Sequence, residues 1–351
     1  SVYYLCECRK FYELNDWYNA LLMCEEGLKL DAKVVEFYQR AIVCCINIYD
    51  AEKAQNFLNK LKEVCFDKDK ITPFENLICD NLKENIEKNR NNKDFIKVHD
   101  ISKKILSNGG KINKVAINTD DPDNRFIYAT ENIKNSDVIL KIPRSLMITP
   151  ACIEKTEIGK FFIENKAKEK LENYDYCIIS TFLLGEMQKG KDSNFYFYFN
   201  FLPKHYTNFP VFYKEIEEKI LEDTKFKFLV YNEKLSVKRD FETVQNIVPF
   251  MKKVSFDDFL LVRMMISSRL FSFEENNISS CILVPFGDLL NHKKYPDVLW
   301  NYDKDDSSFK ITAIKDIKKG TEIFTKYGNK GNENLLLRYG FTIENNVDNA
   351  Y

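Results

Sequence analysis

Three short motifs near the C-terminal end of the chain carry the residue types best suited to chemistry. The first, DLLNH, spans residues 288–292; the second, EIFTKYG, spans 322–328; the third, RYGF, spans 338–341. They supply neutral hydrogen-bonding groups and aromatic rings, and no Ser/His/Asp or Cys/His arrangement for acyl transfer. The chain also lacks the glycine-rich motifs that bind dinucleotides or phosphates. We therefore expect a site that orients reactants which bring their own reactivity.

The order and spacing of these motifs, which follow the D-I-x-K-G run at 316–320, resemble those of SET-domain methyltransferases. The similarity is to the branch of the Rubisco large-subunit methyltransferase, and it extends from about Asp94 to the C-terminus. The resemblance implies a SET fold split by a helical insert. It also implies transfer of a methyl group from S-adenosylmethionine, which leaves S-adenosylhomocysteine, to a lysine amine of a protein substrate, without a metal.

Such a transfer needs the acceptor lysine as a neutral amine. Because a free lysine has a pKa of about 10.4, only about one in 10³ is neutral at pH 7. A dry aromatic channel beside a cationic sulfonium lowers that pKa through desolvation and through the repulsion of like charges. The aromatic and neutral polar residues of the three motifs suit such a channel.

The resemblance also implies roles for individual residues. Asn291 and His292 would hold the cofactor through hydrogen bonds. Tyr327 would place its hydroxyl beside the transferred methyl group, and Tyr339 would supply a second hydroxyl at the lysine channel. The other residues implied at the cofactor are Asp123, Asn124, Arg125, Ser268, Arg269, Asp288 and Phe341, with Tyr327 again.

One turn departs from the family pattern. The family usually has Gly-x-Gly where backbone groups meet the methionine end of the cofactor, and the matching stretch here, residues 123–126, reads DNRF. Asn124 adopts a positive φ more easily than most residues, whereas Phe126 replaces the second glycine. A non-catalytic scaffold that binds a partner peptide is therefore one alternative function.

The nature of the acceptor atom leaves a second alternative. A related branch methylates histidine in actin, with Asn two residues after the arginine and Trp before the aspartate of D-x-x-N-H. Phe271 and Gly287 occupy these positions here. An apolar wall and a small residue suit a long lysine side chain better than a hydrogen-bonded imidazole. We therefore expect Phe271 and Gly287 at a lysine channel, and protein-histidine methyltransferase is the alternative.

The elements that position the motifs are predicted as strands, then helices, then strands. Alternation of apolar and polar residues predicts strands within 111–143 and again within 282–327. The similar sequences ENIKNSDVILKIP and KDIKKGTEIFTKY predict that both halves belong to one sheet system. We expect an α+β SET fold of small sheets with a knotted C-terminal segment. Its parts, 93–150 and 263–351, would flank a helical insert at 151–262.

Residues 1–92 precede these elements and are predicted to be all-helical. At a period of 34 residues Tyr4 aligns with Tyr38 and Ala20 with Ala54, so small and apolar residues recur where paired helices cross. This pattern resembles the tetratricopeptide repeat. The resemblance would add a peptide partner for this region.

Composition narrows the functional class further. With 52 basic and 53 acidic residues the net charge is −1, which argues against direct nucleic-acid binding through phosphate neutralisation. No apolar run reaches the roughly 20 residues of a membrane span, and the start does not resemble a signal peptide. Ten cysteines and three histidines lack the paired spacing of zinc sites. We expect an intracellular protein, cytoplasmic or nuclear, with reduced thiols and neither metal nor membrane association.

Overall fold

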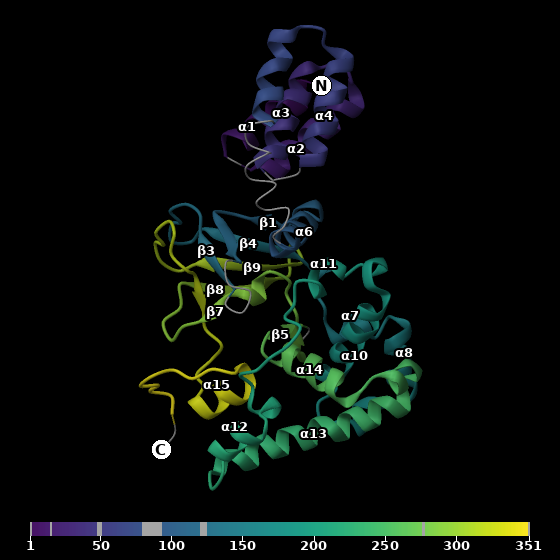
Figure 1. Cartoon of the computed structure of the whole chain (residues 1–351), viewed down its shortest axis with the longest axis vertical. Helices are drawn as coiled ribbons and strands as arrows, with labels where there is room; N and C mark the ends of the chain where they lie inside the picture. The colour runs from purple at the N-terminus through teal and green to yellow at the C-terminus, as the bar shows by residue number, and fades with distance from the viewer. Residues whose placement is uncertain are drawn as a thin grey trace. The chain divides into compact units, whose positions relative to one another are not determined.

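The computed structural model describes residues 2–14, 16–47, 51–78, 93–119, 125–275 and 278–349. The chain divides into two compact units, Ser1–Ser107 and Asn108–Tyr351 (Figure 1). Among the described residues, no helix is both long enough and apolar enough to cross a bilayer. Each unit has its own core and is treated separately below.

The first unit consists of helices in its described part. Its first four helices each pack against the next one, and residues 68–78 are also helical. The helices with assigned bounds are α1 (Val2–Glu13), α2 (Trp17–Leu30), α3 (Val35–Asn47), α4 (Ala51–Val64) and α6 (Lys93–Ser107). Because α6 groups with these helices, the compact unit reaches residue 107.

Small residues allow close helix packing at the positions that the 34-residue period identifies. Ala20 and Ala54 are both fully buried. A β-carbon at Gly27 would lie only 2.1 Å from Cζ of Phe37, so α2 and α3 approach closely at this glycine. Both alanines that the period aligns are therefore core positions of this helical unit.

The second unit is built from small sheets and many helices. A four-stranded antiparallel sheet has the order β1-β4-β9-β8, and two separate pairs, β2–β3 and β5–β6, are also antiparallel. The strands are β1 (Lys111–Ile112), β2 (Val115–Asn118), β3 (Phe126–Ala129), β4 (Val138–Pro143), β5 (Phe271–Glu275), β6 (Ile278–Ile282), β8 (Val298–Asp303) and β9 (Ser308–Ala313). The predicted α+β class is confirmed.

The two similar sequence units pair with each other. The backbone amides of Ile133 and Ile317 each donate to the carbonyl of the other at 2.9 Å. The ammonium of Lys134 lies 2.7 Å from Asp316, next to this bridge. Strand β4 lies in the first of these two segments, β9 ends just before the second, and both strands belong to one sheet. The prediction of a shared sheet system is confirmed.

A short parallel pair joins the first two motifs. Strand β7 (Asn291–His292) pairs with β10 (Phe324–Thr325), with Phe324 opposite Asn291 and Thr325 opposite His292. The chain forms β8 and β9 between these strands. The third motif begins with the last two residues of α15 (Asn332–Tyr339). The next residue, Gly340, has the left-handed conformation with φ 75° and turns the chain to Phe341.

Helices fill the stretch between β4 and β5. Within it, α10 (Tyr174–Lys189), α13 (Lys225–Ile247) and α14 (Phe256–Ser267) contact one another (Figure 1). Both α10 and α14 are buried on nearly every side along their central turns. The shorter helices of this stretch include η1 (Arg144–Leu146), α7 (Pro150–Ile153), α8 (Glu157–Glu164), α9 (Ala167–Lys170), α11 (Tyr196–Phe199) and α12 (Glu215–Ile220).

Candidate active site

A cavity of about 370 Å³ brings the three motifs together. Most of the residues predicted for the site line it, from strands, helices and loops far apart in sequence. Its predicted lining residues are Arg125, Ser268, Arg269, Asp288, Asn291, Tyr327, Tyr339 and Phe341.

Tyr327 is fixed at both its backbone and its hydroxyl. Its backbone N–H donates to Nδ1 of His292 at 3.0 Å, and its hydroxyl donates to the carbonyl of Leu290 at 2.7 Å. Burial raises the pKa of this phenol well above its ordinary value. The hydroxyl is therefore neutral at pH 7, and with its hydrogen engaged it offers a ligand only its lone pairs.

Four aromatic rings, including that of Tyr327, cluster at the site. The Tyr327 ring stacks on His292 at 5.2 Å and on Tyr339 at 4.9 Å between centroids. The Phe341 ring lies 6.1–6.4 Å from the other three. Burial raises the pKa of Tyr339 to about 12. The result is an aromatic wall whose phenols both stay neutral at pH 7.

The imidazole of His292 has a defined role in this packing. Because Nδ1 accepts the Tyr327 amide, the neutral ring carries its proton on Nε2. Burial is the main cause that lowers the pKa of His292, and the positive charges of Lys326 and Lys330 lower it further. His292 is therefore neutral at pH 7.

A buried ion pair forms another wall of the cavity. Nη1 of Arg269 lies 3.2 Å from Oδ2 of Asp288, and the hydroxyl of Tyr198 donates to the same oxygen at 2.8 Å. Only 1% of the Asp288 side chain and 14% of the Arg269 side chain are exposed. Burial raises the pKa of Asp288, although the guanidinium opposes this shift. Burying this ion pair therefore costs desolvation free energy, and loss of either side chain would leave an unpaired charge in the interior.

Two polar atoms of this ion pair are unused. Oδ1 of Asp288 and Nε of Arg269 are buried and lack hydrogen-bond partners among the residues that the structure describes. Buried polar atoms without partners are rare in native proteins. Because both residues line the cavity, an unused acceptor and an unused donor in this pair suit a ligand that carries both a cationic and an anionic group.

Asn291 is held by the start of the second motif. Its side-chain amide donates to Oε1 of Glu322 at 2.8 Å.

Just before the first motif, Phe286 is buried with φ 74° and ψ −48°, a region that non-glycine residues rarely adopt. Such strain persists where the surrounding structure fixes the backbone, and here it precedes the turn that carries Asp288.

Some residues predicted for the site lie elsewhere. Phe271 does not line the cavity and packs instead against the rings of Trp300 and Phe309, with centroids 5.3 and 5.0 Å away. A β-carbon on Gly287 would face Val284 and Ile311 and not the cavity. The structure therefore does not bring either residue to the expected lysine channel. Asp123 and Asn124 lie outside the described residues.

Other lining residues were not predicted. Tyr198 holds Asp288, and the segment after it forms one side of the cavity. The sequence around Tyr198, FYFYFNF, reads as core packing, and only the need of a buried hydroxyl for a partner could have singled it out. The unpredicted lining residues are Pro203, His205, Tyr206, Thr207, Asn208, Phe209 and Leu289.

Comparison with known proteins agrees with this geometry. The family model of the SET domain matches residues 124–328. The ribosomal lysine N-methyltransferase set10 of Schizosaccharomyces pombe is 34% identical over 196 residues, which cover 52% of this chain and 36% of that protein. The chloroplastic Rubisco large subunit N-methyltransferase of Pisum sativum is 28% identical over 245 residues, covering 64% and 47%.

An actin-histidine N-methyltransferase of Xenopus tropicalis is 23% identical over 239 residues, which cover 64% of this chain and 40% of that protein. This chain thus spans less than half the length of each of these three relatives.

Solved structures share the fold. The SET domain of LSMT bound to lysine and AdoHcy superposes with a TM-score of 0.61 at 23% identity, covering 71% of this chain and 58% of that one. Rubisco LSMT bound to AdoMet gives a TM-score of 0.59 at 24% identity, covering 71% and 57%. The family match covers more than half of the sequence, and the motifs converge on one cavity within this fold: the chain belongs to the SET domain family.

Proposed function

We propose that the chain is an S-adenosylmethionine-dependent protein-lysine N-methyltransferase. The observation that carries this proposal is the cavity where a neutral Tyr327 hydroxyl, an aromatic wall and the Asp288–Arg269 pair meet. One relative is named a ribosomal lysine N-methyltransferase, and another is named an N-methyltransferase of the Rubisco large subunit. The first name supports transfer to lysine and makes ribosomal proteins the first substrates to test.

The residues present fit the cofactor. S-adenosylmethionine has an ammonium and a carboxylate at its methionine end, which match the unused acceptor of Asp288 and the unused donor of Arg269. Asn291, Ser268 and Arg125 would add polar contacts from the other walls. When bound, the cofactor supplies an electrophilic methyl group on a cationic sulfonium.

The role of Tyr327 follows from its hydrogen bond. Because its hydrogen is donated to Leu290, the oxygen accepts from the amine N–H and orients the nitrogen lone pair. A phenol with so high a pKa is neither ionised nor a base at pH 7. The lysine proton therefore goes to solvent before the transfer, and the stacked rings of Tyr327 and Tyr339 favour the neutral amine by excluding water.

The alternatives make different predictions about the product. A histidine methyltransferase would yield methylhistidine, and an actin-histidine enzyme is among the relatives. A non-catalytic scaffold would yield no product, but the intact aromatic wall and the fixed Tyr327 hydroxyl favour an enzyme.

The proposal extends to the rest of the chain. The SET parts would be 93–150 and 263–351, with the helical insert at 151–262. Residues 1–92 would be a tetratricopeptide-like region, which the buried small residues at the repeat positions support. This region would bind a peptide partner. The protein would act inside the cell, in the cytoplasm or the nucleus.

Calorimetric titration with S-adenosylmethionine, followed by a transfer assay, tests the proposal. We expect micromolar binding by the wild type, lost in Asn291→Ala and kept in Asn301→Ala, an exposed asparagine of β8. Transfer of labelled methyl groups to ribosomal proteins should then yield methyllysine after acid hydrolysis. A wild-type chain that does not bind the cofactor would overturn the enzyme proposal.

A further inference from the structure

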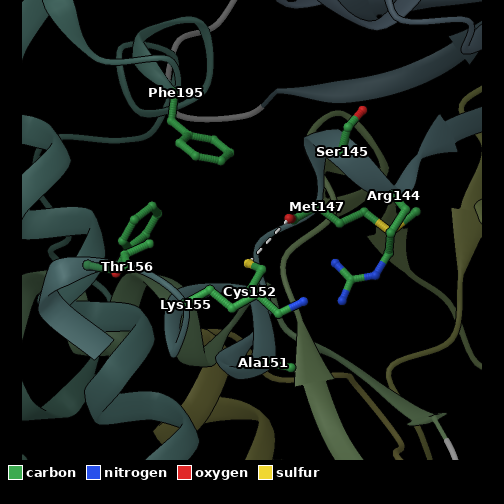
Figure 2. A pocket seen from close by; sticks show the side chains of 9 residues that line it. Arg144, Ser145, Met147, Ala151, Cys152, Lys155, Thr156 and Phe195 are labelled. Atoms are coloured by element: carbon green, nitrogen blue, oxygen red, sulfur yellow. Dashed lines mark hydrogen bonds between the residues drawn. The ribbon is translucent and has the colours of Figure 1, made fainter. Parts of the chain in front are cut away.

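Buried polar atoms that lack a hydrogen-bond partner are not spread evenly over the cavities of this protein. The larger cavity in Figure 2, of about 640 Å³, is lined by Cys152, whose thiol donates to the carbonyl of Met147 at 3.9 Å. Among the described residues, none that lines this cavity has a buried polar side-chain atom without a partner. Such atoms do occur in the smaller cavity of the candidate active site, so unassigned ligand contacts are expected there.

One of these atoms is the hydroxyl oxygen of Tyr206. Tyr206 lines the cavity, and its hydroxyl is buried without a hydrogen-bond partner among the residues that the structure describes. It belongs to the helical stretch between β4 and β5, in the segment that follows α11. Since buried hydroxyls normally have partners, this one suits a group that a ligand supplies.

The position of this hydroxyl is fixed by packing. The ring of Tyr206 meets the ring of Phe209 edge to face, with centroids 4.8 Å apart. Phe209 is buried and packs against Gly340, where an added β-carbon would lie 3.2 Å from Cδ2 of Phe209. Because Gly340 belongs to the third motif, Tyr206 is anchored to a motif that supplies part of the aromatic wall.

The charge near Tyr206 decides which group its hydroxyl can bind. Burial lowers the pKa of Arg269, but the nearby Tyr206 and Asp288 raise it more, so the guanidinium stays charged. A phenol oxygen near a cation turns its lone pairs toward the charge, which leaves its hydrogen available to an acceptor in the cavity. Because Arg269 also has an unused donor at Nε, an anionic acceptor is favoured.

Two tyrosines of the same helical stretch thus serve the buried ion pair. Tyr198 donates to Oδ2 of Asp288 and holds this carboxylate, while Tyr206 acts on the Arg269 side. Oδ1 of Asp288 remains as an unused acceptor. Together these groups offer two donors and one acceptor, which match the carboxylate and the ammonium of an amino-acid group.

We propose that Tyr206 is a further cofactor-binding residue, whose hydroxyl donates a hydrogen bond to the carboxylate at the methionine end of S-adenosylmethionine. Nε of Arg269 donates to the same carboxylate, and Oδ1 of Asp288 accepts from the ammonium. This inference rests on the proposed function, because it assigns one more contact to the cofactor named there. Tyr206 strengthens cofactor binding and does not take part in the transfer, since the methionine side chain separates the carboxylate from the sulfonium.

Calorimetric titration of the whole chain with two forms of the cofactor tests this contact. Decarboxylated S-adenosylmethionine keeps the sulfonium and the amine but lacks the carboxylate, and its Kd is measured by displacement of S-adenosylhomocysteine. We expect Tyr206→Phe to raise the Kd for S-adenosylmethionine about fivefold or more and to change the Kd for the decarboxylated form less than about twofold. The matched control is Tyr213→Phe, at a half-buried tyrosine of the same stretch that does not line the cavity, and it should change neither Kd.

Thermal unfolding without cofactor separates a binding role from a structural one. Because the Tyr206 hydroxyl lacks a partner in the described part of the chain, its removal should leave the midpoint unchanged or raise it. A lower midpoint with equal losses of affinity for both ligands would assign Tyr206 a structural role and overturn the inference. An unchanged Kd for S-adenosylmethionine in Tyr206→Phe would also overturn it, whereas a wild-type chain that binds neither ligand would overturn the proposed function itself.

Discussion

The hydroxyl of Tyr327 donates a 2.7 Å hydrogen bond to the backbone carbonyl of Leu290, one residue before the Asn291-His292 pair. This bond joins the second motif to the first through a side chain, in addition to the pairing of β7 with β10. It also determines what the hydroxyl is able to do, because a phenol whose hydrogen is engaged acts as an acceptor.

Loss of this hydroxyl should affect the chemical step and spare cofactor binding. In Tyr327→Phe the ring stack with His292 and Tyr339 is kept, while the oxygen proposed to orient the amine is lost. We expect the single-turnover rate of methyl transfer to fall about 100-fold or more, with less than about threefold change in the Kd for S-adenosylmethionine. Tyr295→Phe, at a residue 72% exposed, is the control. A Tyr327→Phe enzyme of normal rate would exclude the orienting role.

The buried ion pair should matter for stability. Asp288→Asn leaves the Arg269 charge in the protein interior without a counter-charge, which costs about 3–5 kcal/mol. Urea unfolding without cofactor measures this loss. The matched change Asp316→Asn removes an exposed partner of Lys134 and should cost much less stability. Equal effects of the two substitutions would contradict the argument from burial.

Tyr198 should act as a positioning residue for Asp288. Tyr198→Phe removes the donor that holds Oδ2 but leaves the ring in place. We expect the KM for S-adenosylmethionine to rise about five- to tenfold with a smaller change in kcat, because in the proposed site the carboxylate orients the cofactor and not the amine. Tyr196→Phe, two residues away on α11, is the control. A fall in kcat alone would assign Tyr198 a different role.

Stability should depend on pH through His292. Its pKa is lowered in the folded protein, so below about pH 6.5 the unfolded chain takes up the proton first. The stability contributed by the neutral ring is therefore complete above this pH and is lost as the pH falls toward the folded-state pKa. Urea midpoints at pH 7.5, 6.5 and 5.5 should show the wild type losing its advantage over His292→Asn. A constant difference would contradict the lowered pKa.

The parts of the site that the sequence predicts are those fixed by short-range pattern. The three motifs are expected together because their order and spacing resemble those of SET-domain methyltransferases. The similar segments around Ile133 and Ile317 likewise predict one shared sheet system, because both present the same alternation, and the structure shows that they also pair with each other.

The sequence does not predict contacts between residues far apart in the chain, nor the direction in which a single side chain points. The bond from Tyr198 to Asp288 joins residues 90 positions apart, and no local pattern connects them. Phe271 begins β5, where successive side chains point to opposite faces. Its face is decided by the packing of Trp300 and Phe309 in the neighbouring sheet. Similarly, the periodicity of α6 predicts a helix but not the unit on which it packs.

Because β7 pairs with β10, a strand that is synthesised later, the candidate active site forms late during synthesis of the chain. When a ribosome has completed β9, the four-stranded sheet and the helical stretch before β5 are already made, but Tyr327, Tyr339 and Phe341 are not. Pairings over long sequence separations form slowly, and here the last strand must enter beside a strand made earlier. A nascent chain therefore cannot assemble this cavity before Tyr327, Tyr339 and Phe341 have emerged and docked.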